Sequence, residues 1–410
     1  MREKKPGTVR RPQTSFDFFL ARVVRFTLRG DRVSLPYARK TNWTGWVRFA
    51  MAGETSLRTS GMRIGFQGAA INERGMSVAV YDYASGVQEQ LGHEAVVFYD
   101  KQKSNADVLR KFAGKFRMIG YEGAEDFRSS AEAAHLDFCY FITGGQGAVP
   151  CNLAERTGIH AVFRHFEPSA DVYAYVSKWL ADWMTGGQAP HVPHIVDLPA
   201  PSEDFRAEHG IPADAFVVGR YGGFDQFNLD FAKTAVRQAL EKRNNLYLVF
   251  LNTEPFVAHE RALFLPARVT LQEKSNFIHA CDAGLNAKKI GESFGLANAE
   301  FLACGKPVFT WAGGMDQNHV HLSPSETWVY RNRADLLCLL LETQVSARDT
   351  ELARASTSGL APAPVMRQFD KVFLSGDYRA QDLSLSPAFR LKRWSQEKAL
   401  RAKFRFWKMS

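Results

Sequence analysis

The stretch from Asn286 to Trp311 constrains the fold more than any other part of this 410-residue chain. It begins as a glycine-containing loop and continues into an almost wholly apolar run over residues 296–304. Gly305 and Pro307 follow that run, and both residue types commonly end helices. The next four residues, 308–311, are β-branched or aromatic, which is typical of a strand. The stretch therefore predicts a loop, a packed helix and a buried strand in succession.

Two acids in this stretch are unusual for a packed segment. Glu300 lies inside the predicted helix, and a buried Glu is costly unless something pairs with it. Glu292 lies eight residues earlier, just before the helix. The free amides and the dipole of a helix start favour an anion, and Glu300 lies roughly 7–8 Å farther along the axis at 1.5 Å per residue. The pattern predicts a nucleotide-sugar site, with the diphosphate at the helix start and a carboxylate on either side to accept hydrogen bonds from sugar hydroxyls.

The sequence E-S-F-G-L-A-N-A-E-F-L-A-C-G-K-P-V, with Gly313 and Gly314 after it, resembles the donor-binding domain of retaining GT-B glycosyltransferases of the family-4 type. The resemblance implies an α/β protein with two Rossmann-like, doubly wound domains that face each other across a cleft. It implies a catalytic role for Glu292 and a donor-binding role for Glu300. Further donor-binding residues follow from the same motif: Phe294, Gly295 and Leu296.

The rest of the chain alternates between strand and helix patterns, which favours the same α/β class. Strands are predicted at 62–66, 94–99, 138–142, 160–166, 172–176, 246–251, 308–311 and 328–330. Helices are predicted at 78–91, 178–183, 228–242, 277–280, 296–304 and 334–341. A Gly- and Pro-rich connection at 185–213 separates the two halves.

We expect four parts along the chain. Residues 1–60 form a basic extension, and residues 61–195 form an acceptor domain. Residues 196–365 form the nucleotide-sugar donor domain, whose entry R-x-x-x-G-I-P also resembles the family. Residues 366–410 form a basic segment, and the family suggests that its last helix packs back on the first domain.

Two glycine loops are further candidates for the donor site. The loop I-N-E-R-G-M resembles the glycine loop of the GT-B N-terminal domain, with Gly75 at the position where the backbone approaches the donor diphosphate. It is not the G-x-G-x-x-G dinucleotide fingerprint. In the second half, Arg220 ends a predicted strand and precedes Gly222, and a cation on a glycine loop suits a leaving diphosphate.

One cation that the family usually has is missing. Members usually carry a Lys a few residues after the position of Arg220, whereas this chain has Gln226 and Asn228 there. Lys288 and Lys289, just before Glu292, are the candidates to supply the missing charge, and a solvated lysine pair is the alternative.

His165, in F-R-H-F-E-P, is a candidate sugar contact across the cleft, against the simpler interpretation of a loop histidine. His319 and His321 do not suggest a metal pair, because no Cys or carboxylate cluster completes one. The chain has no D-x-D pair of the kind used by metal-dependent transferases. We therefore expect neither a cofactor nor a metal. The chain also shows no obvious general base, and the resemblance implies a mechanism in which a donor phosphate oxygen accepts the acceptor proton.

The composition bears on the cellular compartment and on the kind of surface that the protein contacts. The five cysteines are scattered, which favours a reducing compartment, and no apolar run is long enough to span a membrane. Residues 1–60 hold 13 Lys or Arg against 4 Asp or Glu, and residues 389–410 hold 8 against 1. Basic ends on an acidic body suggest an anionic partner surface. We expect a cytoplasmic protein, with docking at the inner membrane face as one option and a solvated basic tail as the other.

The predicted partners are a nucleotide-sugar donor, a glycan or lipid-linked acceptor and an anionic membrane surface. Nucleic acid is not expected, because no nucleic-acid-binding motif accompanies the basic ends. A catalytically weak nucleotide-sugar-binding or assembly protein of the same fold is the alternative, since the Lys after Arg220 is absent.

Overall fold

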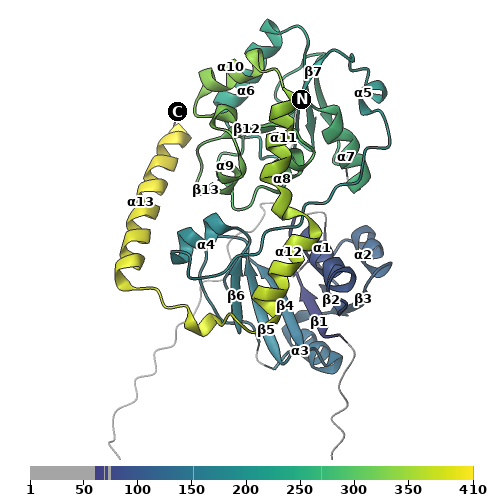
Figure 1. Ribbon diagram of the computed structural model, residues 1–410, viewed down its shortest axis with the longest axis vertical. Helices are drawn as coiled ribbons and strands as arrows, with labels where there is room; N and C mark the ends of the chain where they lie inside the picture. The colour runs from purple at the N-terminus through teal and green to yellow at the C-terminus, as the bar shows by residue number, and fades with distance from the viewer. Residues whose placement is uncertain (1–60, 69, 73–74, 151, 269, 410) are drawn as a thin grey trace, which may run out of the picture. The chain divides into compact units, whose positions relative to one another are not determined.

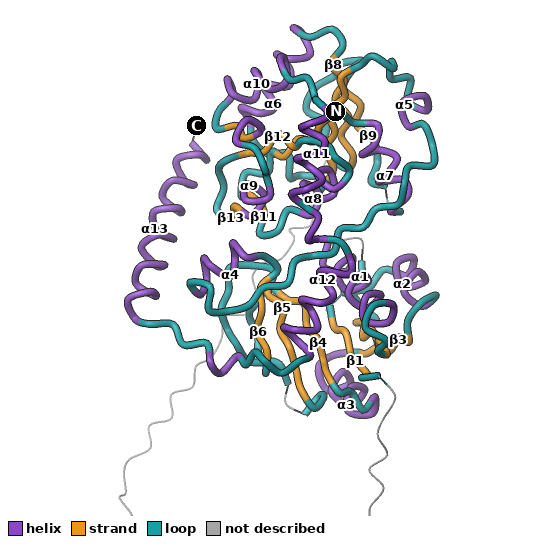
Figure 2. The backbone as a smooth tube through the Cα atoms, viewed as in Figure 1, coloured by secondary structure: helices purple, strands orange, loops and turns teal. Residues whose placement is uncertain are grey.

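The computed structural model describes residues 61–409 except 69, 73–74, 151 and 269 (Figure 1). Its main features are two parallel six-stranded sheets with helices between their strands (Figure 2). We call the parts built on these sheets the N-terminal and the C-terminal domain. The predicted basic extension at 1–60 lies outside the described residues.

The N-terminal domain is built on the first sheet, whose strand order is β3-β2-β1-β4-β5-β6. Its strands are β1 (Arg63–Gln67), β2 (Glu94–Asp100), β3 (Arg117–Tyr121), β4 (Phe138–Thr143), β5 (Arg156–Ala161) and β6 (Val172–Tyr175). Its helices are α1 (Gly75–Glu89), α2 (Ala106–Ala113), α3 (Gly123–Ala134) and α4 (Lys178–Thr185). The order reverses between β1 and β4, so the sheet is doubly wound as predicted.

One predicted strand of this domain is wrong. The apolar character of 160–166 suggested a strand there, but β5 runs from Arg156 to Ala161 and the chain leaves the sheet afterwards. Its neighbours set this limit, because Ala161 pairs with the last residue of β4 on one side and of β6 on the other. Residues 162–166 form the loop that follows β5, which moves His165 from a strand end into that loop.

The C-terminal domain repeats the same plan, with strand order β14-β12-β10-β7-β8-β9. Its strands are β7 (Phe216–Tyr221), β8 (Leu246–Leu251), β9 (Ala262–Leu265), β10 (Ala283–Asn286), β12 (Val308–Trp311) and β14 (Val329–Tyr330), and a separate ladder pairs β11 (Gly291–Glu292) with β13 (Asp316–Gln317). Its helices are α5 (Phe205–Glu208), α6 (Asp230–Lys242), α7 (Leu271–Ala280), α8 (Leu296–Ala303), α9 (Asn318–Leu322) and α10 (Arg333–Glu342).

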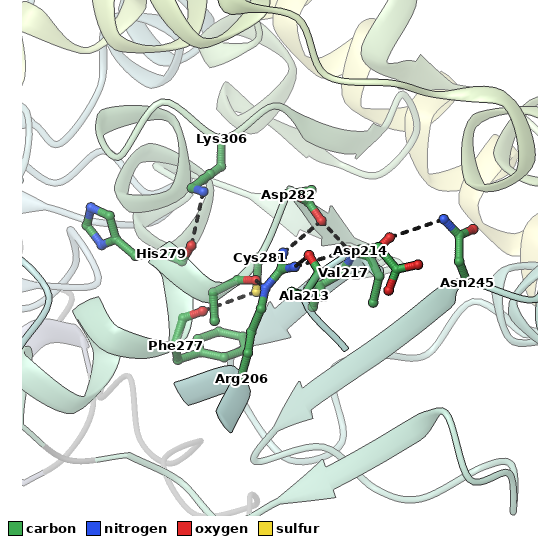
Figure 3. Close-up of polar contacts among 12 residues, drawn as sticks. Arg206, Ala213, Asp214, Val217, Asn245, Phe277, His279, Cys281, Asp282 and Lys306 are labelled. Carbon is green, nitrogen blue, oxygen red and sulfur yellow. Dashed lines mark hydrogen bonds and ion pairs between the residues drawn. The ribbon is translucent and has the colours of Figure 1, made fainter. Parts of the chain in front are cut away.

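The entry to the C-terminal domain is fixed by Arg206 (Figure 3). Its guanidinium donates to the carbonyls of Ala280 (2.8 Å) and Ala213 (3.0 Å) and lies 3.0 Å from Oδ2 of Asp282. The same Asp282 oxygen accepts the amide of Val217 at the start of β7 (2.7 Å). The Arg of the R-x-x-x-G-I-P sequence therefore joins α5, the end of α7 and β7.

The chain returns to the N-terminal domain after α11. Helix α11 (Ala347–Ser356) still packs against α8 of the C-terminal domain, whereas α12 (Pro362–Phe369) packs against α1. Phe369 and Phe373 join Tyr140 in an aromatic cluster of the N-terminal core, with ring centroids 5.0–5.4 Å apart. The predicted boundary at residue 365 falls inside α12, so the return begins earlier than the predicted segment. The final helix, α13 (Pro387–Met409), contacts α4.

Candidate functional site

A pocket of about 240 Å³ lies at the carboxyl ends of β7 and β10. This is the point where the strand order of the second sheet reverses, which is where open α/β sheets bind ligands. Gly75, the first residue of α1, comes from the N-terminal domain. The other lining residues come from the C-terminal domain: Arg220, Tyr221, Gly222, Gln226, Leu285, Asn286, Ala287, Lys288, Glu292, Leu296, Ala297, Asn298, Phe301 and Val308.

The start of α8 forms one wall of the pocket. Gly295 is its N-cap and has a φ of 92°, a left-handed conformation that favours glycine. Leu296, Ala297 and Asn298 follow in the first turn and line the pocket. No acidic side chain lies in this turn, so the positive end of the helix is left for an external anion.

Arg220, at the end of β7, brings a buried cation to the same pocket. Its guanidinium donates to the carbonyls of Gly223 (2.9 Å) and Asn252 (3.3 Å) and to the hydroxyl of Thr253. Burial lowers the pKa of Arg220 to about 10, although the nearby charge of Glu292 opposes that shift. Across the described residues, no carboxylate lies within ion-pair distance of it. A buried cation of this kind is stabilised by an incoming anion.

Glu292 and Lys288 form an ion pair in the pocket wall. Nζ of Lys288 lies 2.8 Å from Oε2 of Glu292, and both side chains are about a quarter exposed or less. Burial raises the pKa of Glu292, while Lys288 and Arg220 oppose the shift and Asp316 adds to it. The predicted catalytic acid therefore lies between two cations, with a second acid nearby.

His319 of α9 supports the backbone at Glu292. Its Nδ1 accepts the amide of Glu292 (3.2 Å), and its Nε2 lies 2.8 Å from the carbonyl oxygen of Trp311. A carbonyl can only accept, so Nε2 carries the proton and the ring is neutral. Burial lowers the pKa of His319 to about 4, which agrees with that state. The sequence did not suggest this role, because only a metal pair was considered for this histidine.

An ion pair between the domains lies beside this wall. Nε of Arg164, in the loop after β5, is 2.7 Å from Oδ1 of Asp316 in β13, and both side chains are mostly buried. β13 pairs with β11, which contains Glu292. Nη1 of Arg164 is buried and has no hydrogen-bond partner among the described residues. Neither residue was predicted from the sequence, although Arg164 adjoins His165 and Asp316 follows the Gly313-Gly314 turn.

Glu300 is buried and is not among the residues that line the pocket. Its Oε1 accepts Nζ of Lys274 from α7 at 2.8 Å. Its Oε2 is buried and has no hydrogen-bond partner within the described chain. Burial raises the pKa of Glu300 well above its usual range, and Asp82 of α1 adds to that effect. Lys274 is the pairing group that the sequence required but did not identify.

The remaining predicted residues divide into two groups. Gly75 and Gly222 line the pocket, and a Cβ at Gly75 would meet open space. A Cβ at Gly222 would lie 2.8 Å from the Arg220 guanidinium, so glycine allows that side chain to fold back. Phe294, Lys289 and His165 are not among the lining residues.

These three have other surroundings. Phe294 is buried, with its ring centroid 4.8 Å from that of His194. The amide of Lys289 donates to Oδ1 of Asn228 at 2.8 Å. The side chain of His165 is exposed, while its carbonyl accepts the hydroxyls of Tyr173 and Tyr175.

Two asparagines add polar atoms at the pocket. Nδ2 of Asn286 donates to Oδ1 of Asn298 at 3.3 Å, which leaves Oδ1 of Asn286 and Nδ2 of Asn298 without partners in the described chain. In the described part of the molecule, His, Cys, Asp and Glu do not gather in groups of three or more that could hold a metal. Nor does any helix in that part combine the length and hydrophobicity that a membrane span requires.

Comparison with solved structures identifies the architecture. HepE from Anabaena, solved with UDP-glucose, superposes with a TM-score of 0.61 over 76% of this chain and 98% of its own, at 16% identity. A glycosyltransferase from Rickettsia africae gives 0.58 over 77% and 98%, at 10% identity. The lipopolysaccharide glycosyltransferase WaaG gives 0.55 over 76% and 100%, at 13% identity.

The protein has the GT-B fold. The predicted fold class, two Rossmann-like domains, is therefore confirmed. No protein-family model and no curated protein sequence matches the chain. In this GT-B chain the pocket joins the C-terminal domain to Gly75 of the N-terminal domain, as expected for a cleft between them.

Proposed function

We propose that the chain is a glycosyltransferase that moves a sugar from a nucleotide-sugar donor to a glycan or glycolipid acceptor, with retention of anomeric configuration. One observation carries the proposal: the start of α8, the buried Arg220 and the Lys288–Glu292 pair meet in one pocket. The solved GT-B neighbours support it, because HepE was solved with UDP-glucose and with UDP and glucose.

In this proposal, different residues bind different parts of the donor. The diphosphate occupies the start of α8 near Leu296, where Arg220 and Lys288 offset its charge. Glu292 lies beside the sugar, and Glu300 accepts the ribose hydroxyls. Gly75 and Gly222 leave room for the donor, Gly295 and Phe294 shape the α8 start, Lys289 adds positive charge, and His165 contacts the sugar from the N-terminal domain.

The chemistry requires little covalent participation by the protein. The bond between the anomeric carbon and the diphosphate oxygen breaks, and its electron pair stays on the diphosphate. The acceptor hydroxyl oxygen bonds to the anomeric carbon on the same face, and its proton passes to a diphosphate oxygen. The protein supplies positioning and charge stabilisation, and the proposal includes neither a metal nor a cofactor.

Thermal unfolding with a panel of nucleoside diphosphate sugars tests the binding half of the proposal. A ligand at 100 times its Kd stabilises the folded state by about 2.7 kcal/mol. We expect at least one donor to raise the unfolding temperature, and Glu300→Ala to reduce that rise. If no nucleotide sugar shifts the transition at millimolar concentration, the pocket is not a donor site.

A nucleotide-sugar-binding protein with weak catalysis is the second candidate. Gln226 lines the pocket in the region where the family usually has a Lys, and the Arg220 guanidinium is already bonded to two carbonyls. Both features reduce the charge available to a leaving diphosphate. Donor binding would raise the unfolding temperature of such a protein, but the protein would not turn the donor over. Turnover therefore distinguishes the two candidates.

We also propose that α13 docks on an anionic membrane surface at the cytoplasmic face. One side of the helix packs on the N-terminal domain, where Arg393 donates to the carbonyl of Met184 at 2.8 Å. The other side exposes Leu391 and Trp394, with Nζ of Lys398 3.8 Å from the Trp394 ring centroid. Exposed apolar side chains among Lys and Arg are typical of helices that lie at lipid headgroups.

Co-sedimentation with vesicles tests the membrane proposal. We expect binding to rise with the fraction of phosphatidylserine and to fall with salt, because each basic residue near such a surface contributes about 1 kcal/mol. Trp394→Ser should weaken binding, whereas Leu352→Ser, at an exposed apolar residue of α11, serves as the control. If binding depended on neither lipid charge nor salt, or if the protein did not bind, we would conclude that α13 is a solvated basic helix.

A further inference from the structure

Lys274 holds one oxygen of Glu300 and leaves the other without a partner. Its Nζ lies 2.8 Å from Oε1, and the side chains of Lys274 and Glu300 are 14% and 5% exposed. Oε2 of Glu300 is buried and has no hydrogen-bond partner within the described residues. A buried polar atom of this kind is costly unless a partner arrives. Within the described residues, one oxygen of the carboxylate therefore has a partner and the other has none.

The surroundings of Lys274 connect it to the pocket and to both domains. Its Nζ lies 5.3 Å from the ring centroid of Tyr221, which lines the pocket. From the N-terminal domain, Asp82 of α1 and Lys111 of α2 act on it electrostatically, with opposite signs. Asp82 also interacts with Lys115 and with Asp197 of the interdomain connection.

Burial works against both charges of the pair. It lowers the pKa of Lys274 to about 8, which Asp82 opposes and Lys111 reinforces. It raises the pKa of Glu300 well above its usual range. Without the ammonium, the buried carboxylate would take up a proton, because an uncompensated charge in such a site is strongly disfavoured. A neutral acid accepts fewer hydrogen bonds than a carboxylate.

We propose that Lys274 is a positioning residue for ribose recognition: it holds Glu300 ionised through Oε1 so that Oε2 accepts a hydroxyl of the nucleotide ribose. This inference rests on the proposed function, since it needs a nucleotide in the pocket. Lys274 itself touches Tyr221 and Glu300 and acts through the carboxylate. The Tyr221 ring lines the pocket and lies under the ammonium, so it belongs to the same arrangement.

The test compares ribose with dideoxyribose. Dissociation constants are measured by calorimetry for ADP, GDP and UDP, each beside its 2′,3′-dideoxy form, in wild type, Lys274→Met and Lys274→Arg. We expect the wild type to prefer the ribose form at least tenfold for one base at pH 7.5. Lys274→Met should lose that preference while its affinity for the dideoxy form stays unchanged, and Lys274→Arg should keep it. Lys306→Met, which removes another partly buried lysine that bonds the His279 carbonyl, is the control and should keep it too.

The pH profile separates this role from a structural one. In the wild type, affinity for the ribose form should rise with pH as Glu300 loses its proton. In Lys274→Met, this rise should occur at higher pH. A Lys274→Met variant that keeps the ribose preference overturns the inference and leaves the proposed function intact. If Lys274→Met lost affinity equally for the ribose and the dideoxy form, the role of Lys274 would be structural. That result also overturns the inference. A wild type that binds none of the three pairs overturns the proposed function itself.

Discussion

Glu292 and Glu300 belong to one short stretch but have different surroundings. Glu292 lines the pocket and pairs with Lys288, whereas Glu300 lies deeper and pairs with Lys274. The difference follows from the local fold: Glu292 is on the β11 ladder, and Glu300 faces inward from the second turn of α8. The two acids should therefore affect different steps.

We expect Glu300→Ala to weaken binding of the free nucleoside diphosphate, because it removes an acceptor of ribose hydroxyls. Glu292→Ala should mainly lower turnover, because it acts near the sugar and not the nucleotide. Calorimetry with the nucleoside diphosphate and steady-state kinetics with the donor measure the two effects. Equal nucleotide affinity in wild type and Glu300→Ala would remove the ribose assignment.

Arg220 should contribute more to rate than to binding. Its guanidinium is held by the carbonyls of Gly223 and Asn252, so it is already oriented before a ligand binds. A fixed cation near a leaving diphosphate stabilises charge that develops in the transition state. We expect Arg220→Ala to lower kcat by about 10²–10³-fold with little change in donor Kd, by analogy with the loss of one fixed donor.

Arg220→Lys is the matched control, because it keeps the charge and loses the planar fork. It should retain more of kcat than Arg220→Ala does. Full activity of Arg220→Ala, with normal thermal stability, would place the phosphate site elsewhere.

At the scale of elements, the β11–β13 ladder positions the pocket wall. Gly291 and Glu292 pair with Asp316 and Gln317, and His319 bonds the Glu292 amide. Neutral His319 bridges this ladder and β12 through the carbonyl of Trp311. Protonation of the ring would turn Nδ1 from an acceptor into a donor and break the bond to Glu292.

His319 should make stability depend on pH. Its pKa is about 4 in the folded protein and about 6.5 in an unfolded chain, so the unfolded state binds more protons between these values. Stability should fall as pH drops from about 6.5 to 4, by at most about 3 kcal/mol from this group. His319→Gln, which cannot titrate, should show a shallower fall in thermal midpoint over that range. Parallel curves would contradict this role.

The sequence predicted elements well where local signals were strong. α8 and β12 lie on either side of Gly305 and Pro307, as predicted, and the helix predicted at 178–183 corresponds to α4. The strand at 160–166 failed because β5 starts with Arg156, Thr157 and Gly158, residues without a clear strand pattern. Its end is set by pairing with β4 and β6, which no local pattern reveals.

At the scale of the whole molecule, the two domains contact each other near Glu292 of the pocket wall. Arg164 pairs with Asp316, and the hydroxyl of Ser177 donates to the carbonyl of Ser293 at 2.7 Å. These partners are more than a hundred residues apart in sequence. The same holds for Asp82 and Lys274, so the sequence could place the predicted acids and Arg220 but not the groups that hold them.

We expect Arg164 and Asp316 to be energetically coupled. A double-mutant cycle with Arg164→Met and Asp316→Asn, measured on kcat/KM, should give a coupling energy of about 0.5–3 kcal/mol, as for buried charged neighbours. The exposed pair Arg331–Glu326, with atoms 2.8 Å apart, is the control and should give a coupling close to zero. Additive effects of the two substitutions would mean that the Arg164–Asp316 contact does not serve catalysis.

Turnover of an isotope-labelled donor tests the central claim most directly. The protein is incubated with each labelled nucleotide sugar that shifts its thermal unfolding, with oligosaccharide and glycolipid acceptors, and released nucleoside diphosphate and labelled product are measured. We predict that one donor gives both in equal amounts, and that Arg220→Ala and Glu292→Ala each lower the rate at least a hundredfold. Donor binding without release of nucleoside diphosphate, or a rate that both substitutions leave unchanged, would contradict the assignment of transfer chemistry to this pocket.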